Sequence, residues 1–327
     1  SDYEWEIPIE EGMKVPGKIF SSKKLLNQNK NDFCFEQIKR VAKLPRILKN
    51  SFVMPDFHQG YGFPIGGVAA FDKEEGVIAP EGVGYDINCG IRALITNAKE
   101  KDFLKLKEKI IKKIQKEISL GNNSEEKSIK EIEEILKLGA KKAIQEGFGK
   151  KGDLEFCEEN GQMKNANPKY VSLRAKERGK FQAGTLGSGN HFIEFGKVEK
   201  IFDEEIGKKI GIKKGLLYVL VHSGSRGLGH QVASDYIDKI KKEGKNQEIA
   251  YTKINSKNGK EYLSAMNCAA NFAFYNRQLI TNKIDKILKE FFPKNKSFIF
   301  YDICHNIAKF EKHKIDGKEK EILVIRK

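Results

Sequence analysis

Apolar residues change their spacing several times along the chain. Over residues 36–48, Ile38, Val41, Leu44 and Leu48 follow a helical period, which predicts an amphipathic helix interrupted at Pro45. Between residues 51 and 97 glycine becomes dense and charge falls, and short β-type runs over residues 67–71, 76–78 and 91–96 predict strands joined by turns. Because functional residues often lie on loops between buried strands, this stretch is a candidate for chemistry.

Residues 98–147 have the opposite character, because lysine and glutamate dominate and isoleucines recur at helical spacing. The pattern predicts two amphipathic helices with solvated faces, joined near residues 121–123, and we interpret it as a Lys/Glu-rich helical insertion. Residues 148–168 are expected to form a loop, and residues 169–178 a short helix ended by Gly179.

The remaining segments alternate between strands and one long helix. Strands are predicted from near His191, over residues 216–221 and over residues 297–303. Residues 261–291 predict a helix in which Ala265, Ala269, Ala270 and Ala273 allow close packing. Together these elements predict an α+β fold with a mixed sheet core and helical insertions.

Composition narrows the class of protein. The chain has 327 residues, of which 39% are hydrophobic, so it can bury a substantial core. Its 60 basic and 45 acidic residues give a formal net charge of +15, which favours polyanions such as nucleic acid or a membrane surface. A lysine-rich genome would give the same charge without a nucleic-acid role, so charge alone decides nothing.

The five cysteines are an odd number without paired spacing, and no N-terminal apolar run resembles a signal peptide. No stretch approaches the roughly 20 apolar residues of a membrane helix. We therefore expect an intracellular, reducing and cytoplasmic location, with no membrane partner.

Asp86 and Cys89 place a carboxylate and a thiolate three residues apart between glycines, which alone is a weak metal signal. His191, His222 and His305 strengthen it, because each lies at the end of a predicted strand. Thiolate with imidazole suits zinc, while carboxylate with imidazole around more than one ion suits manganese, iron or zinc. Five ligands exceed one tetrahedral ion, and a Cys89 that bridged two ions would use all of them.

The other histidines carry weaker signals. His313 lies in a charged loop, and His230 is expected to open a helix in a capping or surface role. A hydrogen-bonded structural role fits His58 at least as well as a functional one. The glycine-rich loop at residues 223–229 contains Arg226 and suits a phosphate, although it lacks the ending of a Walker sequence.

Several uncommon strings, taken in their order, closely resemble the RtcB family of RNA ligases. They are Met54-Pro55-Asp56, residues 60–67, Gly-Tyr-Asp-Ile-Asn-Cys-Gly at 84–90, Leu-Gly-Ser-Gly-Asn-His-Phe at 186–192, residues 222–231, Tyr301-Asp302 and His305-Asn306. The resemblance runs from about Trp5 to the last residue. It implies an RtcB-like ligase domain over residues 1–327.

The resemblance implies a GTP-dependent ligase with two Mn²⁺ ions that joins an RNA 3′-phosphate or 2′,3′-cyclic phosphate to a 5′-hydroxyl, in tRNA splicing, tRNA processing and RNA repair. Its RNA would be tRNA halves, and archease would be an accessory partner. At the matching positions, the resemblance implies that Cys89 bridges the two ions, that Asp86 and His191 complete the protein ligands of one ion, and that His222 and His305 complete those of the other. It implies that Arg226 faces an RNA phosphate and that Asp56 is a nearby catalytic carboxylate. The residues implied to hold the guanylate are Asn190, His191, Phe192, Ile193, Glu194, His305 and Asn306.

One feature of the family has no counterpart in this sequence. The histidine that accepts GMP belongs to a Cys-His-Gly-Ala-Gly-Arg setting that follows the point where these residues stop, so about the first two thirds of the family's length is matched. We expect a truncated fold whose GMP step needs a C-terminal ligase fragment in trans, and which exposes an unpaired sheet edge and apolar surface. A fragment, a split-gene half and a degenerate relative all remain open.

Two other functions compete with ligation. A two-metal cyclic-phosphate phosphoesterase would use the same ligands without a covalent histidine. A non-catalytic RNA-binding subunit would depend on the positive charge alone, and its RNA binding would survive loss of the metal ligands.

Overall fold

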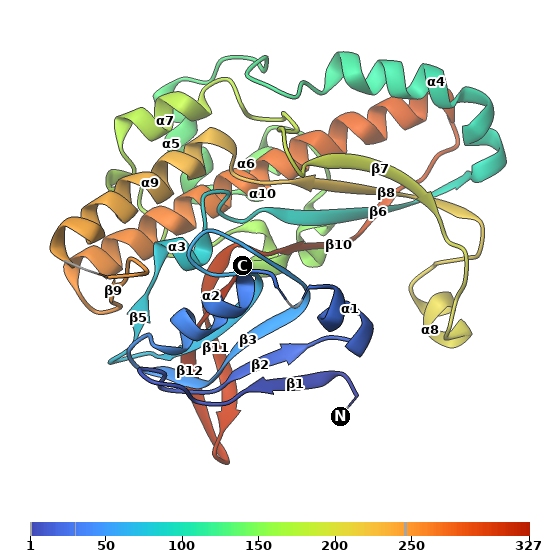
Figure 1. The fold of residues 1–327 in the computed structure, drawn as a ribbon. Helices are drawn as coiled ribbons and strands as arrows, with labels where there is room; N and C mark the ends of the chain where they lie inside the picture. Colours follow the sequence, from blue (N-terminus) through green and yellow to red (C-terminus); the bar gives the residue numbers. More distant parts are fainter. Residues whose placement is uncertain (1, 30, 245–246) are drawn as a thin grey trace. The chain divides into compact units, whose positions relative to one another are not determined.

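The computed structural model describes residues 2–29, 31–244 and 247–327. The chain forms two compact units, each of which is assembled from separate segments (Figure 1). The first unit contains residues up to 87, 229–266 and 305–327, and the second contains residues 88–228 and 267–304. Two helices, α9 (Arg226–Glu243) and α10 (Lys257–Phe291), contribute residues to both units.

The first unit is built on a six-stranded sheet in the order β1-β2-β3-β4-β12-β11. Strands β2 and β3 are parallel and the other neighbours are antiparallel, so the sheet is mixed. Its elements are β1 (Glu4–Ile7), β2 (Gly17–Phe20), α1 (Lys23–Gln28), α2 (Cys34–Ala42), β3 (Ile47–His58), β4 (Ile65–Asp72), β5 (Val77–Ile78), α3 (Pro80–Val83), β9 (Thr252–Lys253), β11 (Ile307–Ile315) and β12 (Lys318–Arg326).

Helix α2 covers part of this sheet with the apolar face that the sequence predicts. Ile38 is fully buried against Val53 and Phe57 of β3. The helix ends at Ala42, before Pro45, which cannot continue a helical hydrogen-bond pattern. Leu48 lies in β3 rather than in the helix, so the predicted helix was too long at its C-terminal end.

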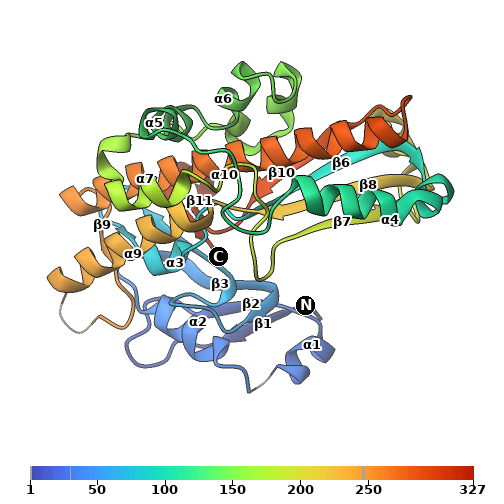
Figure 2. The same ribbon diagram turned by 90° about the horizontal axis from the view of Figure 1, so that it is seen from above.

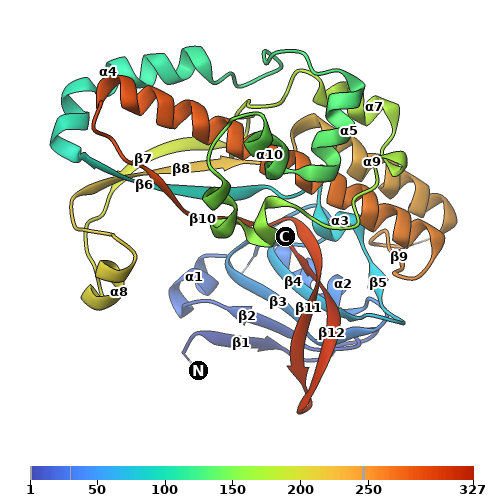
Figure 3. The ribbon, with the colours of Figure 1, turned by 180° about the vertical axis from the view of Figure 1, so that it is seen from behind.

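Strand β12 is paired on both sides, with β4 and with β11 (Figure 3). Its residues from Ile322 to Ile325 are buried. The last strand is therefore not an edge strand, because the β11–β12 hairpin folds back, and β11, which among the described strands pairs with β12 alone, forms an unpaired edge of the sheet.

The second unit is built on a four-stranded antiparallel sheet in the order β10-β6-β8-β7. Its elements are β6 (Gly90–Lys99), α4 (Glu100–Glu117), α5 (Ile129–Leu138), α6 (Ala140–Gln145), α7 (Leu173–Gly179), β7 (Phe192–Lys197), α8 (Glu204–Lys209), β8 (Leu216–Ser223) and β10 (Phe298–Cys304), with short 3-10 helices at η1 (Lys151–Phe156), η2 (Glu158–Gly161) and η3 (Pro168–Tyr170). The segment predicted as a loop over residues 148–168 thus contains helical turns.

Helices α4 and α10 lie side by side on one face of this sheet (Figure 2). Ile110 and Ile114 of α4 and Ile284 of α10 pack against Val219 and Val221 of β8. The small residues predicted for close packing, Ala265, Ala269, Ala270 and Ala273, are all fully buried. The long helix therefore supplies much of the support beneath the strands.

The predicted helical insertion forms α4, α5 and α6. Ser128 caps α5 and exchanges hydrogen bonds with Glu131 in a capping box, which fixes the start of the helix. Gly139 adopts a φ of 57° and separates α5 from α6. Both units combine a β-sheet with α-helices, and the sheet of the first unit is mixed. This arrangement confirms the predicted α+β fold with a mixed sheet and helical insertions. Among the helices of the described residues, none is long and apolar enough to cross a membrane.

Candidate metal centre

The register of the four-stranded sheet gathers distant segments at one end. Gly90, the first residue of β6, is paired with Ser223 of β8 and with Cys304 of β10. Phe192, the first residue of β7, is paired with His222 of β8. Because the strands are antiparallel, the beginnings of β6 and β7 meet the ends of β8 and β10 at the same edge of the sheet, namely the one formed by the ends of the strands. The residues that flank these pairs are therefore neighbours.

Cys89, His191 and His222 come together at this edge within the second unit. The Sγ atom of Cys89 lies 3.3 Å from Nε2 of His191 and 3.1 Å from Nε2 of His222. The two imidazole rings are 5.5 Å apart and nearly perpendicular. The thiol is buried and both rings are half-buried, so a ligand held here would be largely shielded from water.

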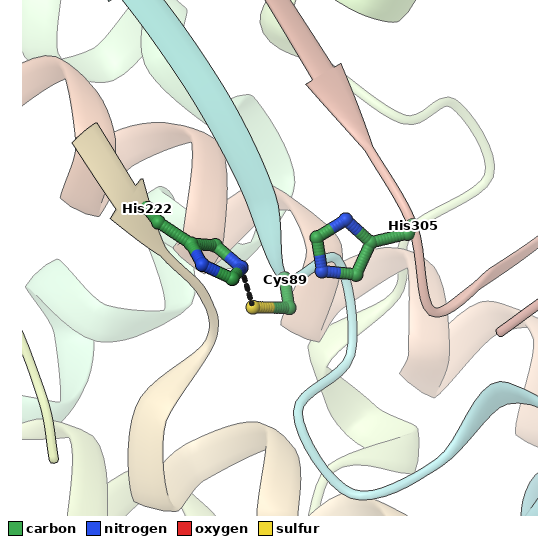
Figure 4. A group of neighbouring side chains, drawn as sticks. All are labelled: Cys89, His222 and His305. Carbon is green, nitrogen blue, oxygen red and sulfur yellow. Dashed lines mark hydrogen bonds between the residues drawn. The ribbon is translucent and has the colours of Figure 1, made fainter. Parts of the chain in front are cut away.

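Asp86 and His305 lie close to this group because of their positions in the sequence. Asp86 stands three residues before Cys89, and His305 directly follows the last residue of β10. Cys89, His191 and Asp86 form one set whose ligand atoms lie within 4.8 Å of one another, and Cys89, His222 and His305 form a second. In Figure 4 both rings of the second set are turned toward the Cys89 side chain.

This donor set fits a metal centre. Two ligands of one tetrahedral ion with bonds of about 2.0 to 2.3 Å are separated by roughly 3.5 Å, close to the separations between the Cys89 sulfur and the imidazole nitrogens. The two sets share Cys89 alone. Because Cys89 belongs to both sets, its thiolate is the donor placed to serve two ions while each ion keeps its own carboxylate or imidazole ligands.

A buried arginine, which the sequence analysis missed, supports the backbone of this edge. Arg277 of α10 donates from Nη1 to the carbonyl oxygens of Asn88 and Ser223, at 2.7 Å and 3.0 Å, and from Nη2 to the side-chain oxygen of Asn88. Asn88 precedes Cys89 and has a left-handed φ of 54°, whereas Ser223 follows His222. Arg277 thus holds the residues next to two of the candidate ligands.

Asp302 of β10 connects this arginine to a second one. Its Oδ1 accepts from Nε of Arg277 at 2.8 Å, and its Oδ2 accepts from Nε and Nη2 of Arg92 at 2.9 Å and 2.6 Å. All three side chains are fully buried. Arg92 also donates to Cys157, whose thiol stays neutral because burial raises its pKa to about 11. The carboxylate of Asp302 is thus shared by two guanidinium groups.

Arg226 and Gly187 lie close to His191. Gly187 has a φ of +111°, and a Cβ atom there would overlap Nδ1 of His191 and Nη1 of Arg226. Arg226 donates to the hydroxyl of Thr185 at 3.3 Å and to the carbonyl of Leu120 at 3.1 Å. The guanidinium predicted to face a phosphate is therefore positioned beside a candidate metal ligand.

The other predicted site residues have the following places. Asp56 lies near the end of β3 and is exposed. Asn190 and Glu194 are exposed at the beginning of β7, and Phe192 lies with its ring 5.1 Å from that of His222. Asn306 donates to the carbonyl of Asp86 at 3.2 Å.

The three remaining histidines lie outside the two ligand sets. His58 is the last residue of β3, His313 lies in β11, and His230 lies four residues inside α9, which begins at Arg226. The prediction that His230 opens a helix was therefore displaced by one turn. None of the five cysteines, all of which the structure describes, forms a disulfide.

The sequence matches the family described as tRNA-splicing ligase RtcB over residues 37–327. It is 46% identical over 339 residues to a tRNA-splicing ligase RtcB of Thermococcus kodakarensis, covering 99% of this chain and 70% of the relative. It is 43% identical over 343 residues to the protein of the same name from Archaeoglobus fulgidus, covering 100% of this chain and 71% of the relative. It is also 42% identical to an RNA-splicing ligase RtcB homolog 1 of Entamoeba histolytica, covering 95% of this chain and 60% of the relative.

Proposed function

Because the chain belongs to the RtcB family, we propose that it is an RNA ligase of tRNA splicing. One observation carries the proposal beyond the likeness itself. Three separate strings of family-type sequence supply Cys89, His191 and His222. The Nε2 atoms of both histidines lie within hydrogen-bond distance of the Cys89 sulfur. Such a thiolate and imidazole cluster suits divalent metal ions, which commonly serve phosphoryl chemistry.

The proposed reaction joins an RNA 3′-phosphate or 2′,3′-cyclic phosphate to a 5′-hydroxyl with GTP and two Mn²⁺ ions. Bound ions would stabilise the negative charge that develops on phosphate oxygens. Cys89 would be shared by both ions, with Asp86 and His191 on one and His222 and His305 on the other. The grouping of these residues into two sets that share one sulfur supports this assignment.

Residues around the centre would bind the two substrates. The segment from Asn190 to Glu194, together with His305 and Asn306, would hold the guanylate. Arg226 would contact an RNA phosphate, because its guanidinium is fixed beside His191 and presents several donors in one plane. Asp56 would act as a nearby carboxylate.

The attachment of GMP needs a nucleophile that we place outside these 327 residues. His58, His230 and His313 lie outside the ligand sets, and none stands in the family's Cys-His-Gly-Ala-Gly-Arg setting. We propose that a polypeptide carrying that setting completes the step and that archease assists it. We propose that the protein acts in the cytoplasm.

The test uses two RNAs, one ending in a 2′,3′-cyclic phosphate and one beginning with a 5′-hydroxyl. They are incubated with the chain, Mn²⁺ and GTP, with and without a polypeptide that contains the Cys-His-Gly-Ala-Gly-Arg segment. Joining that requires GTP, Mn²⁺ and the added polypeptide is expected. The matched control is Cys89→Ala, which should abolish joining.

Other outcomes would favour the competing functions. Hydrolysis of the cyclic phosphate without GTP and without joining would indicate a phosphoesterase. RNA binding that persists in Cys89→Ala, with no joining under any condition, would indicate a binding subunit. Either result would overturn the proposed ligase.

A further inference from the structure

Three aromatic rings form a ladder in the first unit, and the proposed metal and nucleotide sites do not use them. The ring centroids of Tyr61 and Tyr85 are 5.1 Å apart, with planes tilted by 43°. Those of Tyr85 and His230 are 4.6 Å apart, with planes only 20° apart, which is a stacked arrangement. Tyr61 is 45% exposed and His230 is exposed as well, so both outer members of the ladder present aromatic surface to solvent.

The loop that carries Tyr61 is held by buried polar side chains. Gln37 is 4% exposed, and it donates to the carbonyl oxygens of Gly60 and Gly62 at 2.8 Å and 3.2 Å and accepts from the amide of Gly60 at 2.9 Å. Lys327 donates from Nζ to the carbonyl of Tyr61 itself at 2.7 Å. Both flanks and the carbonyl of this exposed tyrosine are therefore fixed, which lowers the entropy lost when a ligand binds its ring.

A lysine lies next to the same ring. The Nζ atom of Lys241 is 5.8 Å from the centroid of Tyr61 and 2.5 Å from Oε1 of Glu81. Glu81 is 2% exposed, and its other oxygen accepts from the amide of Ala250 at 2.8 Å, so the partner of the lysine is itself anchored. The ladder thus combines aromatic faces with a positioned positive charge.

This combination suits a base that is attached to a phosphate. Single-stranded RNA is commonly bound by aromatic side chains that stack on its bases, next to basic groups that attract its backbone. The formal charge of +15 favours such a polyanion. Tyr85 is followed in the chain directly by Asp86, so a base on the ladder would belong to a nucleotide close to the reacting end.

We propose that the ladder of Tyr61, Tyr85 and His230 stacks with a base of the RNA substrate near its reacting end, with Lys241 beside the phosphate of that nucleotide. This inference rests on the proposed function as an RNA ligase. It assigns to the first unit a base-binding subsite in addition to the phosphate contact proposed for Arg226.

The test uses a short single-stranded RNA with 2-aminopurine as its terminal base, because stacking on an aromatic ring quenches the fluorescence of this base. The wild-type chain is expected to bind the RNA and to quench the fluorescence. Tyr61→Ala should weaken binding at least about 5-fold and remove most of the quenching. Tyr61→Phe, which keeps the ring, should stay within about 2-fold of wild type, and His230→Ala should resemble Tyr61→Ala.

Two controls separate stacking from other causes. Tyr3→Ala removes a tyrosine that is 66% exposed but lies outside the ladder, and it should leave binding unchanged. The slope of log affinity against log salt should be the same for wild type and Tyr61→Ala, because stacking releases no counterions. Thermal unfolding of each variant shows that it remains folded.

Several results would overturn the inference. If Tyr61→Ala and His230→Ala both bind and quench as the wild type does, the ladder has no base-binding role while the proposed ligase stands. If GTP displaces the labelled RNA from the ladder at lower concentration than unlabelled RNA does, the site belongs to a nucleotide and not to RNA. If the wild type binds no RNA, the inference and the proposed function both fail.

Discussion

The guanidinium of Arg277 donates a hydrogen bond of 2.7 Å to the carbonyl of Asn88, the residue that precedes Cys89. The same side chain contacts the carbonyl of Ser223, which follows His222. A single buried group therefore fixes the backbone beside two candidate metal ligands. Asn88 has a left-handed φ of 54°, which asparagine adopts more readily than most residues with a side chain, and the bonds from Arg277 hold it in this conformation.

We predict that Arg277→Lys lowers the affinity for Mn²⁺ by about 10- to 100-fold, because groups that orient metal ligands typically contribute this much. A lysine keeps the charge opposite Asp302 but cannot reach Asn88 and Ser223 with one planar group. The affinity is measured by titration with Mn²⁺, using the electron paramagnetic resonance of the unbound ion.

Arg92→Lys is the matched control for this prediction. Arg92 binds the same carboxylate of Asp302, but none of its hydrogen bonds goes to the residues beside Cys89 or His222. Both variants should lose unfolding free energy on the order of 3 kcal/mol, because each disturbs a buried ion pair. Equal losses of Mn²⁺ affinity in the two variants would contradict a positioning role for Arg277.

Removal of the shared thiol should affect both proposed ions. We predict that Cys89→Ala lowers Mn²⁺ affinity at both sites by at least about 100-fold, since a lost ligand should cost no less than a lost supporting group. His191→Ala should remove one of the two ions and leave the other. Stoichiometry is measured by metal analysis after equilibrium dialysis.

Cys268→Ala provides the control for the thiol. Cys268 is fully buried in α10, and burial raises its pKa to about 12, so it is a neutral thiol and a poor ligand. This variant should lose about 1 kcal/mol of stability and bind Mn²⁺ as the wild type does. Unchanged metal binding in Cys89→Ala would sink the assignment of the centre.

Gly187 allows His191 and Arg226 to approach the backbone closely. We predict that Gly187→Ala reduces both Mn²⁺ affinity and stability, because the new Cβ would displace the His191 ring and the Arg226 guanidinium. The overlap should cost about 1 to 3 kcal/mol in addition to the strain of a positive φ. Denaturant unfolding and Mn²⁺ titration measure the two effects.

Gly189→Ala isolates the contribution of the backbone. Gly189 has a φ of +70°, but no atom of the residues that the structure describes lies within 4 Å of the position that its Cβ would take. It should therefore share the cost of the positive φ, on the order of 1 to 2 kcal/mol, and keep the metal affinity. A loss of Mn²⁺ affinity as large as that of Gly187→Ala would show that the overlap is not the cause.

Lys327 makes the stability of the first unit depend on pH. Burial lowers the pKa of its ammonium to about 8, whereas in the unfolded chain the pKa is about 10.4. Between these values the unfolded chain binds a proton that the folded chain does not bind, so stability rises with pH. We predict that the contribution of Lys327 to the free energy of unfolding rises by about 2 kcal/mol between pH 7.5 and 9.5.

The measurement compares denaturant unfolding of wild type and Lys327→Met at both pH values. Methionine removes the titrating group, so the difference in stability between the two proteins should shift in favour of wild type at the higher pH. A difference that is independent of pH would refute the prediction. Because other groups titrate equally in both proteins, the comparison isolates Lys327.

Local sequence was sufficient to predict most elements. The spacing of Ile38 and Val41 predicted α2, because a helix with one buried face has apolar residues at a helical period. The β-type run at residues 91–96 predicted β6, because a buried strand has a continuous run of apolar residues. Helix limits were less accurate. The strand that begins at Ile47 and the 3-10 helices after Lys151 depend on tertiary pairing and turns that periodicity does not report.

The sequence by itself determined the five candidate ligands, since thiolate, carboxylate and imidazole groups stand in unusual strings beside predicted strands. Only the tertiary structure decided that they share an edge. The antiparallel register aligns the beginning of β6 with the end of β8, and a shift of one residue would turn His222 to the other face. Arg277 lies 189 residues from Asn88, so the contact that supports the edge has no local pattern and exists only when the sheet and α10 are packed together.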